Sequence, residues 1–282
     1  MTDTLRLAVP NKGRLKSPSV ELLQAAGLRF EATDRALSVR VDNADIDLLF
    51  VRTEDVPELV ADGVADLGIT GVDLLAEFGE DLEVVLELGY GRCRLAAAVP
   101  NASELTKVED FADKRIATAH PGVTGRYFLE RDIDVTVVPL RGSVEVATKL
   151  GVADGIVDLV STGSTLRVNG LREVGTLLES EAILVSGGRG NGAVDRIATA
   201  IGSVIQARRK RYLLLNAPVG SVDAIAAVIP GLTAPTVMPL AGGEMCAIHS
   251  VVDADDVWHL LPRIEEAGGQ GILVLPIEQL IP

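Results

Sequence analysis

The feature that most constrains this chain is a twelve-residue segment that occurs twice. Residues 60–71 read VADGVADLGITG, and residues 152–163 read VADGIVDLVSTG. Eight of the twelve positions are identical, a density that common residues alone rarely produce. The repeat predicts two related α/β lobes, each with the same helix–turn–strand–loop–helix corner. Two lobes that face each other form a cleft, and clefts are where small ligands usually bind.

The segments around the repeat alternate between strand-like and helix-like patterns. Short apolar runs predict strands at residues 5–9, 46–51, 94–99, 115–118, 135–140 and 155–160. We expect one helix to begin near Ser17-Pro18, with Ser17 as its cap, and others to span residues 53–61 and 195–211. This alternation predicts an α/β fold with mostly parallel sheets.

The tail after about residue 211 has a different order of elements. Apolar stretches predict strands at residues 212–216, 236–240, 245–252 and 271–275. Helices are expected at residues 221–228 and 253–267, the second with Asp253 as a cap. The order βαββαβ is the ferredoxin-like plan, which predicts a small open-faced domain for ligand sensing or for dimerisation.

Composition excludes several classes of protein. A net charge of −14 argues against a nucleic-acid partner, which requires a basic face. No apolar run reaches the ~18 residues of a membrane span, and no secretion signal precedes the first strand, so we expect a cytoplasmic protein. Cys93 and Cys246 are expected to be buried free thiols. The three histidines, His120, His249 and His259, lack metal-ligand spacing and are interpreted as structural.

Each copy of the repeat has the features of an anion site. An apolar strand leads into a Thr-Gly loop that opens the next helix, where exposed N–H groups and the helix dipole favour negative charge. The second copy is richer, because Ser161, Thr162, Ser164 and Thr165 place four hydroxyls around Gly163. Loops of this composition are most often plain turns, so the interpretation depends on their context.

Two aspartates supply that context. Asp154 and Asp158 lie four residues apart just upstream of the loop, and Asp158 falls inside the apolar run 156–160. An acid in a buried strand needs a partner or a function. The even spacing predicts that both carboxylates lie on one side of the strand. Such carboxylates can hold ribose hydroxyls or Mg²⁺; the alternative, acids at the edge of a strand in solvent, stays open.

The segment 145–166, EVATKLGVADGIVDLVSTGSTL, resembles the signature segment of the ATP phosphoribosyltransferases. The resemblance extends along the whole chain. Further matching segments are PNKGRL (10–15), similar to the family's first substrate loop, DLGITG (66–71), similar to its second, CRL (93–95) and RIAT (115–118). One departure is His120, where the family more usually has a tyrosine, so stacking of this side chain on a base is not expected.

The resemblance implies a two-lobed catalytic unit of the periplasmic-binding-protein type (type II) and a C-terminal ferredoxin-like domain that binds histidine. The implied domains are a first catalytic lobe of residues 1–90 with 181–211, a second lobe of residues 91–180 with the phosphate loop, and a regulatory domain of residues 212–282. It also implies a homo-oligomer in which dimers join into hexamers.

The activity that the resemblance implies is a pentosyl transfer. N1 of the adenine of ATP displaces pyrophosphate from phosphoribosyl pyrophosphate (PRPP), giving N1-(5-phosphoribosyl)-ATP in the first step of histidine biosynthesis. The cofactor would be Mg²⁺, and histidine would be a feedback inhibitor.

The resemblance also assigns roles to individual residues. Those expected to bind PRPP are Asp154, Gly155, Asp158, Ser161, Thr162, Gly163, Ser164 and Thr165. Those expected to bind ATP are Lys12, Gly13, Arg14, Gly68, Ile69, Thr70, Gly71 and Tyr90. Asp154, Asp158, Lys12 and Arg14 are the candidate catalytic residues, and the two aspartates the candidate Mg²⁺ ligands, directly or only through the substrate. Histidine is expected to contact Leu232, Ala234, Thr236 and Gly271. Lys12 and Arg14 as solvated loop charges, and Tyr90 as a hinge-packing residue, remain alternatives.

Two other functions are compatible with parts of the sequence. A cytoplasmic ligand-binding protein has the same two-lobe layout, but such a protein has less need for the two aspartates together with the hydroxyl loop. A different PRPP-dependent transferase, such as a nucleobase salvage enzyme, is disfavoured by the C-terminal domain and by the two-lobe repeat.

Overall fold

The computed structural model describes residues 4–31, 36–188, 192–229 and 234–281. The chain divides into two compact units. Unit 1 comprises Met1–Gln24 with Leu28–Asp195, and unit 2 comprises Ala25–Gly27 with Arg196–Pro282. Within the described residues, no helix is both long enough and apolar enough to cross a membrane.

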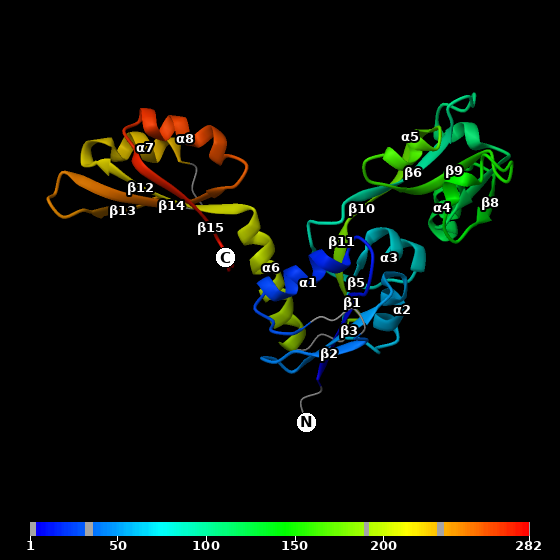
Figure 1. Ribbon diagram of the computed structural model, residues 1–282, viewed down its shortest axis with the longest axis horizontal. Helices are drawn as coiled ribbons and strands as arrows, with labels where there is room; N and C mark the ends of the chain where they lie inside the picture. The colour runs from blue at the N-terminus through cyan, green and yellow to red at the C-terminus, as the bar shows by residue number, and fades with distance from the viewer. Residues whose placement is uncertain (1–3, 32–35, 189–191, 230–233, 282) are drawn as a thin grey trace. The chain divides into compact units, whose positions relative to one another are not determined.

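The first lobe of unit 1 is built on a six-stranded sheet with the order β2-β3-β1-β4-β11-β5 (Figure 1). Its strands are β1 (Leu5–Pro10), β2 (Ser38–Arg40), β3 (Ile46–Val51), β4 (Leu67–Gly71), β5 (Glu83–Glu87) and β11 (Ala182–Ser186). Its helices are α1 (Lys16–Ala25), α2 (Val56–Ala61), which follows the 3₁₀ turn η1 (Thr53–Asp55), and α3 (Val72–Phe78). Both neighbours of β1 run parallel to it, as strand–helix alternation predicts.

The second lobe is built on a five-stranded sheet with the order β10-β6-β9-β7-β8. Its strands are β6 (Cys93–Pro100), β7 (Lys114–Thr118), β8 (Val135–Pro139), β9 (Gly155–Val160) and β10 (Leu171–Ser180). Its helical segments are α4 (Pro121–Leu129), α5 (Ser164–Val168) and the 3₁₀ turns η2 (Val108–Phe111) and η3 (Val144–Val146). Alternate residues of β6 enter different apolar clusters, Ala96 with Ile156 in one and Leu95 with Phe111 in the other. The sheet is therefore buried on both faces.

The two lobes share one topology, which confirms the prediction made from the repeat. In the first lobe β1 is parallel to β3 and β4, and β4 is antiparallel to β11. In the second lobe β7 is parallel to β8 and β9, and β9 is antiparallel to β6. The strands β4 and β9, which carry the repeated segment, therefore hold equivalent places in the two sheets.

The repeat does not have the same local structure in both copies. In the first copy, Thr70 and Gly71 are the last residues of β4, both buried, and α3 starts at once at Val72. In the second copy, Thr162 and Gly163 lie in a loop between β9 and α5. The expected strand–loop–helix corner is thus present only in the second copy, and in the first the strand passes directly into the helix.

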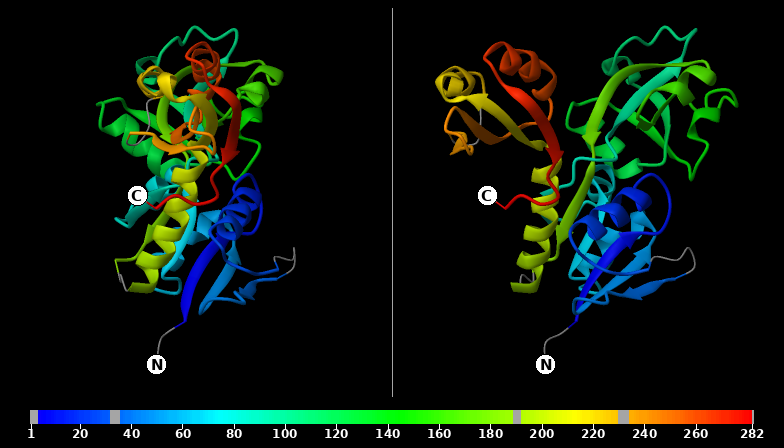
Figure 2. Two further views of the ribbon diagram at one scale, coloured as in Figure 1. Left: turned by 90° about the vertical axis from the view of Figure 1, so that its left-hand side faces the viewer. Right: turned by 60° about the vertical axis from the view of Figure 1, so that its left-hand side comes forward.

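Unit 2 contains a four-stranded antiparallel sheet with the order β13-β14-β12-β15. Its elements are β12 (Lys210–Pro218), η4 (Val219–Ser221), α7 (Val222–Val228), β13 (Thr236–Pro239), β14 (Met245–Asp253), α8 (Val257–Glu266) and β15 (Gln270–Pro276). Both helices lie on one face of this sheet (Figures 1 and 2) and share an apolar core with it, formed by Leu215, Ile225, Ile248 and Leu260 among others. The predicted ferredoxin-like domain is therefore confirmed.

Helix α8 is amphipathic and carries the chain's single tryptophan. Leu260 and Ile264 are buried against the sheet, whereas the side chain of Trp258 is 81% exposed. The tryptophan therefore takes no part in the core of unit 2.

Several element boundaries differ from those expected from sequence, and three of the differences change the position assigned to a named residue. The long helix α6 (Gly192–Arg208) ends before the basic run does, because Lys210 already belongs to β12 and its Nζ lies 2.8 Å from Oδ1 of Asp253. Asp253 is consequently the last residue of β14 and not a helix cap, and α8 begins only at Val257. Helix α1 begins at Lys16, so Ser17 lies inside it. The expected domain boundaries at residues 90, 180 and 211 stay predictions.

Candidate active site

A cavity of about 950 Å³ in unit 1 has walls from both lobes. The lining residues from the first lobe are Lys12, Gly13, Arg14, Leu15, Arg52, Thr53, Glu54, Asp55, Asp73 and Leu74. Those from the second lobe are Ala119, His120, Leu140, Arg141, Gly142 and Leu159. Four of these residues are cations and three are acids, so the wall has a net positive charge in a chain whose own net charge is −14. The cavity is of the size that small-molecule sites have, and its cations favour an anionic ligand.

The loop after β1 supplies the predicted residues that line this cavity. The N–H of Asn11 donates to the carbonyl of Val51 at 2.8 Å and so ties the loop to the end of β3. Gly13 then turns the chain with a φ of 76°, a conformation that a side chain would strain. Lys12, Gly13 and Arg14 are consequently exposed at the cavity wall, where the sequence predicts a nucleotide-binding loop.

Two further arginines at the cavity were not singled out from sequence. Arg52 follows the last residue of β3 directly, and Arg141 comes two residues after the end of β8. These two strands hold equivalent places in the two lobes, so the arginines are equivalent as well. The sequence signal that could have identified both arginines is a basic residue just beyond the carboxyl end of a predicted parallel strand, where α/β folds place their ligands.

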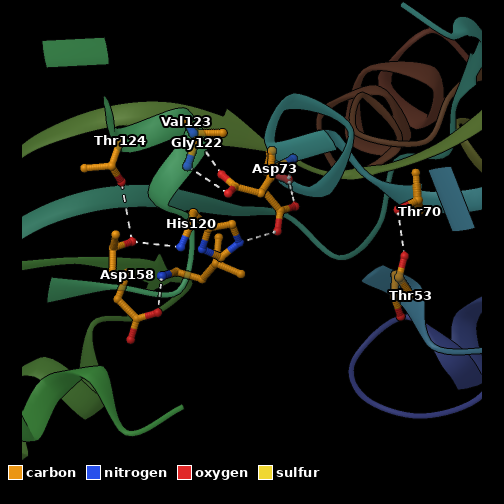
Figure 3. A network of polar contacts seen from close by, with 12 residues as sticks. Thr53, Thr70, Asp73, His120, Gly122, Val123, Thr124 and Asp158 are labelled. Atoms are coloured by element: carbon orange, nitrogen blue, oxygen red, sulfur yellow. Dashed lines mark hydrogen bonds and ion pairs between the residues drawn. The ribbon is translucent and has the colours of Figure 1, made fainter. Parts of the chain in front are cut away.

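Asp73, near the start of α3, is the buried centre of a polar network (Figure 3). Its side chain accepts a hydrogen bond from the hydroxyl of Ser180, whose Oγ in turn accepts the N–H of Asp73 at 3.1 Å. Oδ1 lies 3.6 Å from Nη2 of Arg14, and Oδ2 lies 3.6 Å from Nε2 of His120. Burial raises the pKa of Asp73, but the hydrogen bonds from His120 and Ser180 and the charge of Arg14 outweigh it, so the net pKa is lowered. The residue is therefore held as a carboxylate.

His120, directly before α4, faces Asp73 from the second lobe. Its N–H donates to Oγ1 of Thr118 at 2.9 Å, which fixes the chain at the end of β7. The imidazole is 8% exposed, and its Nδ1 is buried without a hydrogen-bond partner among the described residues. At the position where the resemblance implies a tyrosine, the cavity wall thus carries a polar ring that an acid of the other lobe orients.

The amino end of α4 is occupied by an acid of the first lobe. The N–H groups of Gly122 and Val123 donate to Oε1 and Oε2 of Glu77 on α3, each at 2.8 Å (Figure 3). In return, Nη2 of Arg126 on α4 donates to the carbonyl of Ala76. The lobes are therefore joined at this point by hydrogen bonds in both directions.

Asp154 directly precedes β9, whereas Asp158 is the fourth of its six residues. Oδ1 of Asp158 accepts the N–H of Leu159 at 2.8 Å, and Leu159 lines the cavity. Burial raises the pKa of Asp158; the charge of Glu145 adds to this, and the N–H of Leu159 and His120 offset it only in part. Asp154 is exposed before the first residue of β9, about 13 Å of strand away, and its Oδ2 accepts the N–H of Arg115 at 2.8 Å. The structure does not bring the two carboxylates together.

The hydroxyl loop lies between β9 and α5, and its residues are not among those that line the cavity. Ser161, Thr162, Ser164 and Thr165 are exposed, and Gly163 has a φ of 71°. Oγ1 of Thr162 lies 3.0 Å from Oγ of Ser164, so two of the four hydroxyls already point toward each other. The loop opens α5 and can offer both hydroxyls and free backbone N–H groups to a phosphate.

Other predicted residues have structural surroundings and do not line the cavity. A Cβ on Gly68 would come within 2.4 Å of Val56, so glycine allows α2 to pack closely on β4. A Cβ on Gly155 would meet Phe111 at 2.5 Å. Ile69, Thr70 and Gly71 are buried in β4, and Oγ1 of Thr70 donates to the carbonyl of Thr53 at 3.2 Å. The hydroxyl of Tyr90 lies 2.7 Å from Oγ of Ser19, which agrees with the alternative of packing at the hinge.

The described residues do not form a resident Mg²⁺ site. No group of three or more His, Cys, Asp or Glu side chains among them is arranged to hold a metal ion. The two candidate ligands lie apart, because Asp154 precedes β9 and Asp158 is its fourth residue, and each accepts a backbone N–H; their role toward Mg²⁺ stays a prediction.

The candidate histidine-binding residues lie on the two edge strands of unit 2. Thr236 is in β13 and Gly271 in β15, the outer strands of the sheet, and both are exposed, as is Ala234. Three strand spacings separate these edges, about 14 Å. Leu232 lies outside the described residues. One copy of the chain therefore does not bring Thr236 and Gly271 together.

Comparison with known proteins identifies the family. The profile of the family HisG: ATP phosphoribosyltransferase matches residues 52–203, and that of HisG, C-terminal domain, matches residues 207–279. The ATP phosphoribosyltransferase of Gemmatimonas aurantiaca is 46% identical over 99% of this chain and 100% of its own length. That of Haloarcula marismortui is 44% identical over 98% of this chain and 100% of its own length.

Solved structures give the same result. A chain of the ATP phosphoribosyl transferase (HisG:HisZ) complex from Thermotoga maritima superposes with a TM-score of 0.61 at 30% identity, covering 70% of this chain and 98% of that one. The substrate binding protein of an amino acid ABC transporter superposes with a TM-score of 0.50 at 13% identity, covering 72% and 93%, which shows a shared fold only. The chain therefore belongs to the ATP phosphoribosyltransferase family, the transferases of histidine biosynthesis.

Proposed function

We propose that this chain condenses ATP with PRPP through N1 of adenine, giving N1-(5-phosphoribosyl)-ATP and pyrophosphate as the first step of histidine biosynthesis. The observation that carries the proposal is the cavity between the lobes, which has four cations in its wall and is lined by Leu159, two residues before the hydroxyl loop. Both substrates are polyphosphates, and the combination of cations, hydroxyls and backbone N–H groups suits such ligands.

The four cations of the cavity wall come from both lobes. Lys12, Arg14 and Arg52 project from the first lobe and Arg141 from the second, so polyphosphate groups bound between them neutralise charge on both walls. Arg14 also lies beside Asp73, which limits its freedom and directs its guanidinium. We assign the triphosphate of ATP and the diphosphate of PRPP to these four side chains.

The second lobe would hold the sugar of PRPP. Ser161 to Thr165 would bind its 5′-phosphate through hydroxyls and the N–H groups at the start of α5. Asp158 would accept hydrogen bonds from the ribose hydroxyls. Burial raises the pKa of this carboxyl, and the N–H of Leu159 offsets the effect only in part, so its ionised form gains from further hydrogen-bond donors.

The reaction itself needs alignment and charge complementarity more than a strong base. N1 of adenine forms a bond to C1 of the ribose while the bond from C1 to the diphosphate oxygen breaks. The pyrophosphate leaves with the bonding electron pair and is stabilised by the cations of the cavity. Positive charge on the ribose in the transition state is stabilised by the carboxylate of Asp158.

Mg²⁺ enters this proposal as part of the substrate. Since the described residues do not form a metal site, the ion would arrive bound to the phosphates of PRPP or ATP, as Mg²⁺ commonly does.

Regulation by histidine is proposed for unit 2. Thr236 and Gly271 lie on opposite edges of its sheet, so a site that contains both requires the β13 edge of one copy and the β15 edge of another. Histidine binding at such a site would favour an assembly of subunits that turns over poorly, which is inhibition at a distance. A homo-oligomer is therefore part of the proposal.

The test mixes the protein with ATP, PRPP and Mg²⁺ and measures pyrophosphate together with the mass of the nucleotide product. We expect one pyrophosphate for each molecule whose mass equals ATP plus the phosphoribosyl group, and less of both when histidine is present. Binding of ATP without release of pyrophosphate would instead indicate a ligand-binding protein. Release of pyrophosphate only with a free nucleobase would indicate a salvage transferase.

A further inference from the structure

The contact between α3 and α4 consists of specific hydrogen bonds that run in both directions between the lobes. Glu77 of the first lobe accepts two N–H groups of the second, and Arg126 of the second donates to a carbonyl of the first. Asp73, near the start of α3, meets His120, which directly precedes α4. We call the contacts of Glu77 with Gly122 and Val123, and of Arg126 with Ala76, the α3–α4 joint.

The chemistry of this joint is specific. The first N–H groups of a helix have no partner within the helix, and the dipole makes this end attractive to anions. Here both oxygens of one carboxylate satisfy two successive N–H groups at 2.8 Å each. The amino end of α4, which faces the first lobe, is therefore filled by the protein's own acid and is not available to a substrate phosphate.

Gly122 leaves room for this approach. A Cβ at this position would lie 3.0 Å from Oε1 and 3.2 Å from Cδ of Glu77. The backbone of Gly122 does not have a positive φ, so no turn demands glycine here, and alanine is the better residue for a helix. The three atoms nearest to such a Cβ all belong to Glu77, so this contact favours glycine at this point.

We propose that Glu77 is a positioning residue that holds the two lobes closed on each other and so sets the width of the substrate cavity. The inference rests on the proposed function, because it assumes that ATP and PRPP bind between the lobes. The cavity has Arg14 and Arg52 on one wall and His120 and Arg141 on the other. The distance between these walls depends on how α3 meets α4, and a substrate that spans both walls binds only when they are correctly spaced.

This role predicts a particular kinetic signature. When only a fraction of the molecules is closed, the apparent affinity for each substrate falls by that fraction, while molecules saturated with substrate are closed and turn over normally. Loss of the joint should therefore raise KM for ATP and for PRPP by a similar factor, about tenfold, and change kcat by less than about twofold. Partial unfolding would instead lower kcat and leave KM unchanged.

Two variants should weaken the α3–α4 joint, one with a substitution in each lobe. Glu77→Gln replaces one acceptor oxygen by an NH₂ group, which cannot accept the second N–H. Gly122→Ala adds a methyl group 3.0 Å from Oε1 of Glu77, so the carboxylate must shift for the methyl group to fit, and no charge changes. The matched controls are Glu80→Gln, exposed just beyond the end of α3, and Gly125→Ala, in the same helix with no atom within 4 Å of the added Cβ.

Hydrogen exchange of the full-length protein tests the α3–α4 joint independently of an activity measurement. We expect the N–H groups of Gly122 and Val123 to exchange faster in both joint variants than in the wild type and both controls, and ATP with PRPP to restore protection. Unchanged exchange in Glu77→Gln and Gly122→Ala would overturn the joint itself. Faster exchange with unchanged KM values, or a loss of kcat at constant KM, would overturn its positioning role.

The same experiment separates this inference from the proposed function. A wild-type protein that released no pyrophosphate would refute the function, while the exchange comparison would still report the joint. Should Glu77→Gln fail to fold, Gly122→Ala carries the test, because alanine favours the helix in which it lies.

Discussion

Asp66 and Asp154 perform the same task in the two lobes. Oδ2 of Asp66 accepts the N–H of Arg6 at 2.7 Å, and Oδ2 of Asp154 accepts the N–H of Arg115 at 2.8 Å. Each aspartate also returns a bond, because its own N–H donates to the carbonyl of the same arginine. Asp66 precedes β4 and Asp154 precedes β9, so both tie the start of a repeated strand to its neighbour. Matching the two copies by sequence pairs Asp154 with Asp62, whereas the hydrogen bonds pair it with Asp66.

The first prediction is that Asp154 acts in stability and not in binding. Asp154→Asn and Asp66→Asn should each lower the free energy of unfolding by about 1 kcal/mol, with unchanged KM for PRPP. Chemical denaturation and initial-rate kinetics would measure the two quantities. A large loss of turnover in Asp154→Asn with normal stability would restore the interpretation of this residue as a ribose ligand.

The second prediction concerns Asp158, for which we expect the opposite result. Asp158→Asn should lower kcat by about 100-fold or more, because a carboxylate that stabilises the ribose is lost. Its stability should be equal to that of the wild type or higher at neutral pH. The raised pKa means that the folded state binds this proton more tightly than the unfolded state does.

The pH dependence provides a check on this second prediction. The favourable contribution of protonated Asp158 is complete below the ordinary aspartate pKa of about 4 and is lost as pH rises through the raised pKa. The stability of Asp158→Asn relative to the wild type should therefore increase from acidic to neutral pH. Strong destabilisation of this variant at neutral pH, with normal turnover per folded molecule, would make the acid structural.

The third prediction concerns the phosphate loop. Thr162→Val removes a hydroxyl that donates to a charged phosphate, so the KM for PRPP should rise roughly 10- to 100-fold. Gly163→Ala should raise it as well, because the φ of 71° disfavours alanine and the loop must rearrange. Gly170→Ala is the matched control, since Gly170 has a φ of 70° and no atom lies within 4 Å of an added Cβ. Equal KM values in Gly163→Ala and Gly170→Ala would place the phosphate elsewhere.

The fourth prediction concerns histidine and uses two defective subunits. Thr236→Val and Gly271→Val alter opposite edges of the sheet in unit 2, and each variant alone should lose inhibition by histidine. When the two variants are unfolded together and reassembled, some sites combine the intact β13 edge of one copy with the intact β15 edge of another. Partial recovery of inhibition in the mixture, and not in either variant alone, is the expected result. A mixture that stays insensitive would contradict a site shared between copies.

The sequence predicted the fold of this chain more completely than it predicted the functional site. Apolar runs such as 46–51 and 155–160 mark strands, because a sheet covered on both faces needs continuous apolar residues. Local signals failed where a distant partner decides the conformation. The basic run at the end of α6 reads as helix, yet Lys210 leaves the helix because it pairs with Asp253 across the sheet. The same pairing removes Asp253 from the start of α8.

The candidate site was predicted only in part for a related reason. Lys12 to Arg14 and the hydroxyl loop are contiguous in sequence and can be recognised as loops. Asp73 and Glu77 act through partners that lie about 45 residues away or more, and no local pattern reveals such partners. Even spacing alone suggested that Asp154 and Asp158 act together. It could not show that β9 begins between them and that Asp154 is engaged by Arg115.

The position of Trp258 confines the intrinsic tryptophan fluorescence of the chain to unit 2. The only tryptophan of the chain lies on α8 of unit 2, exposed to solvent, whereas none of the residues that line the cavity in the described part of unit 1 is aromatic apart from the imidazole of His120. Intrinsic tryptophan emission therefore originates entirely from unit 2. A change in this emission on adding histidine would report on unit 2 directly, free of any overlapping tryptophan signal from the catalytic lobes.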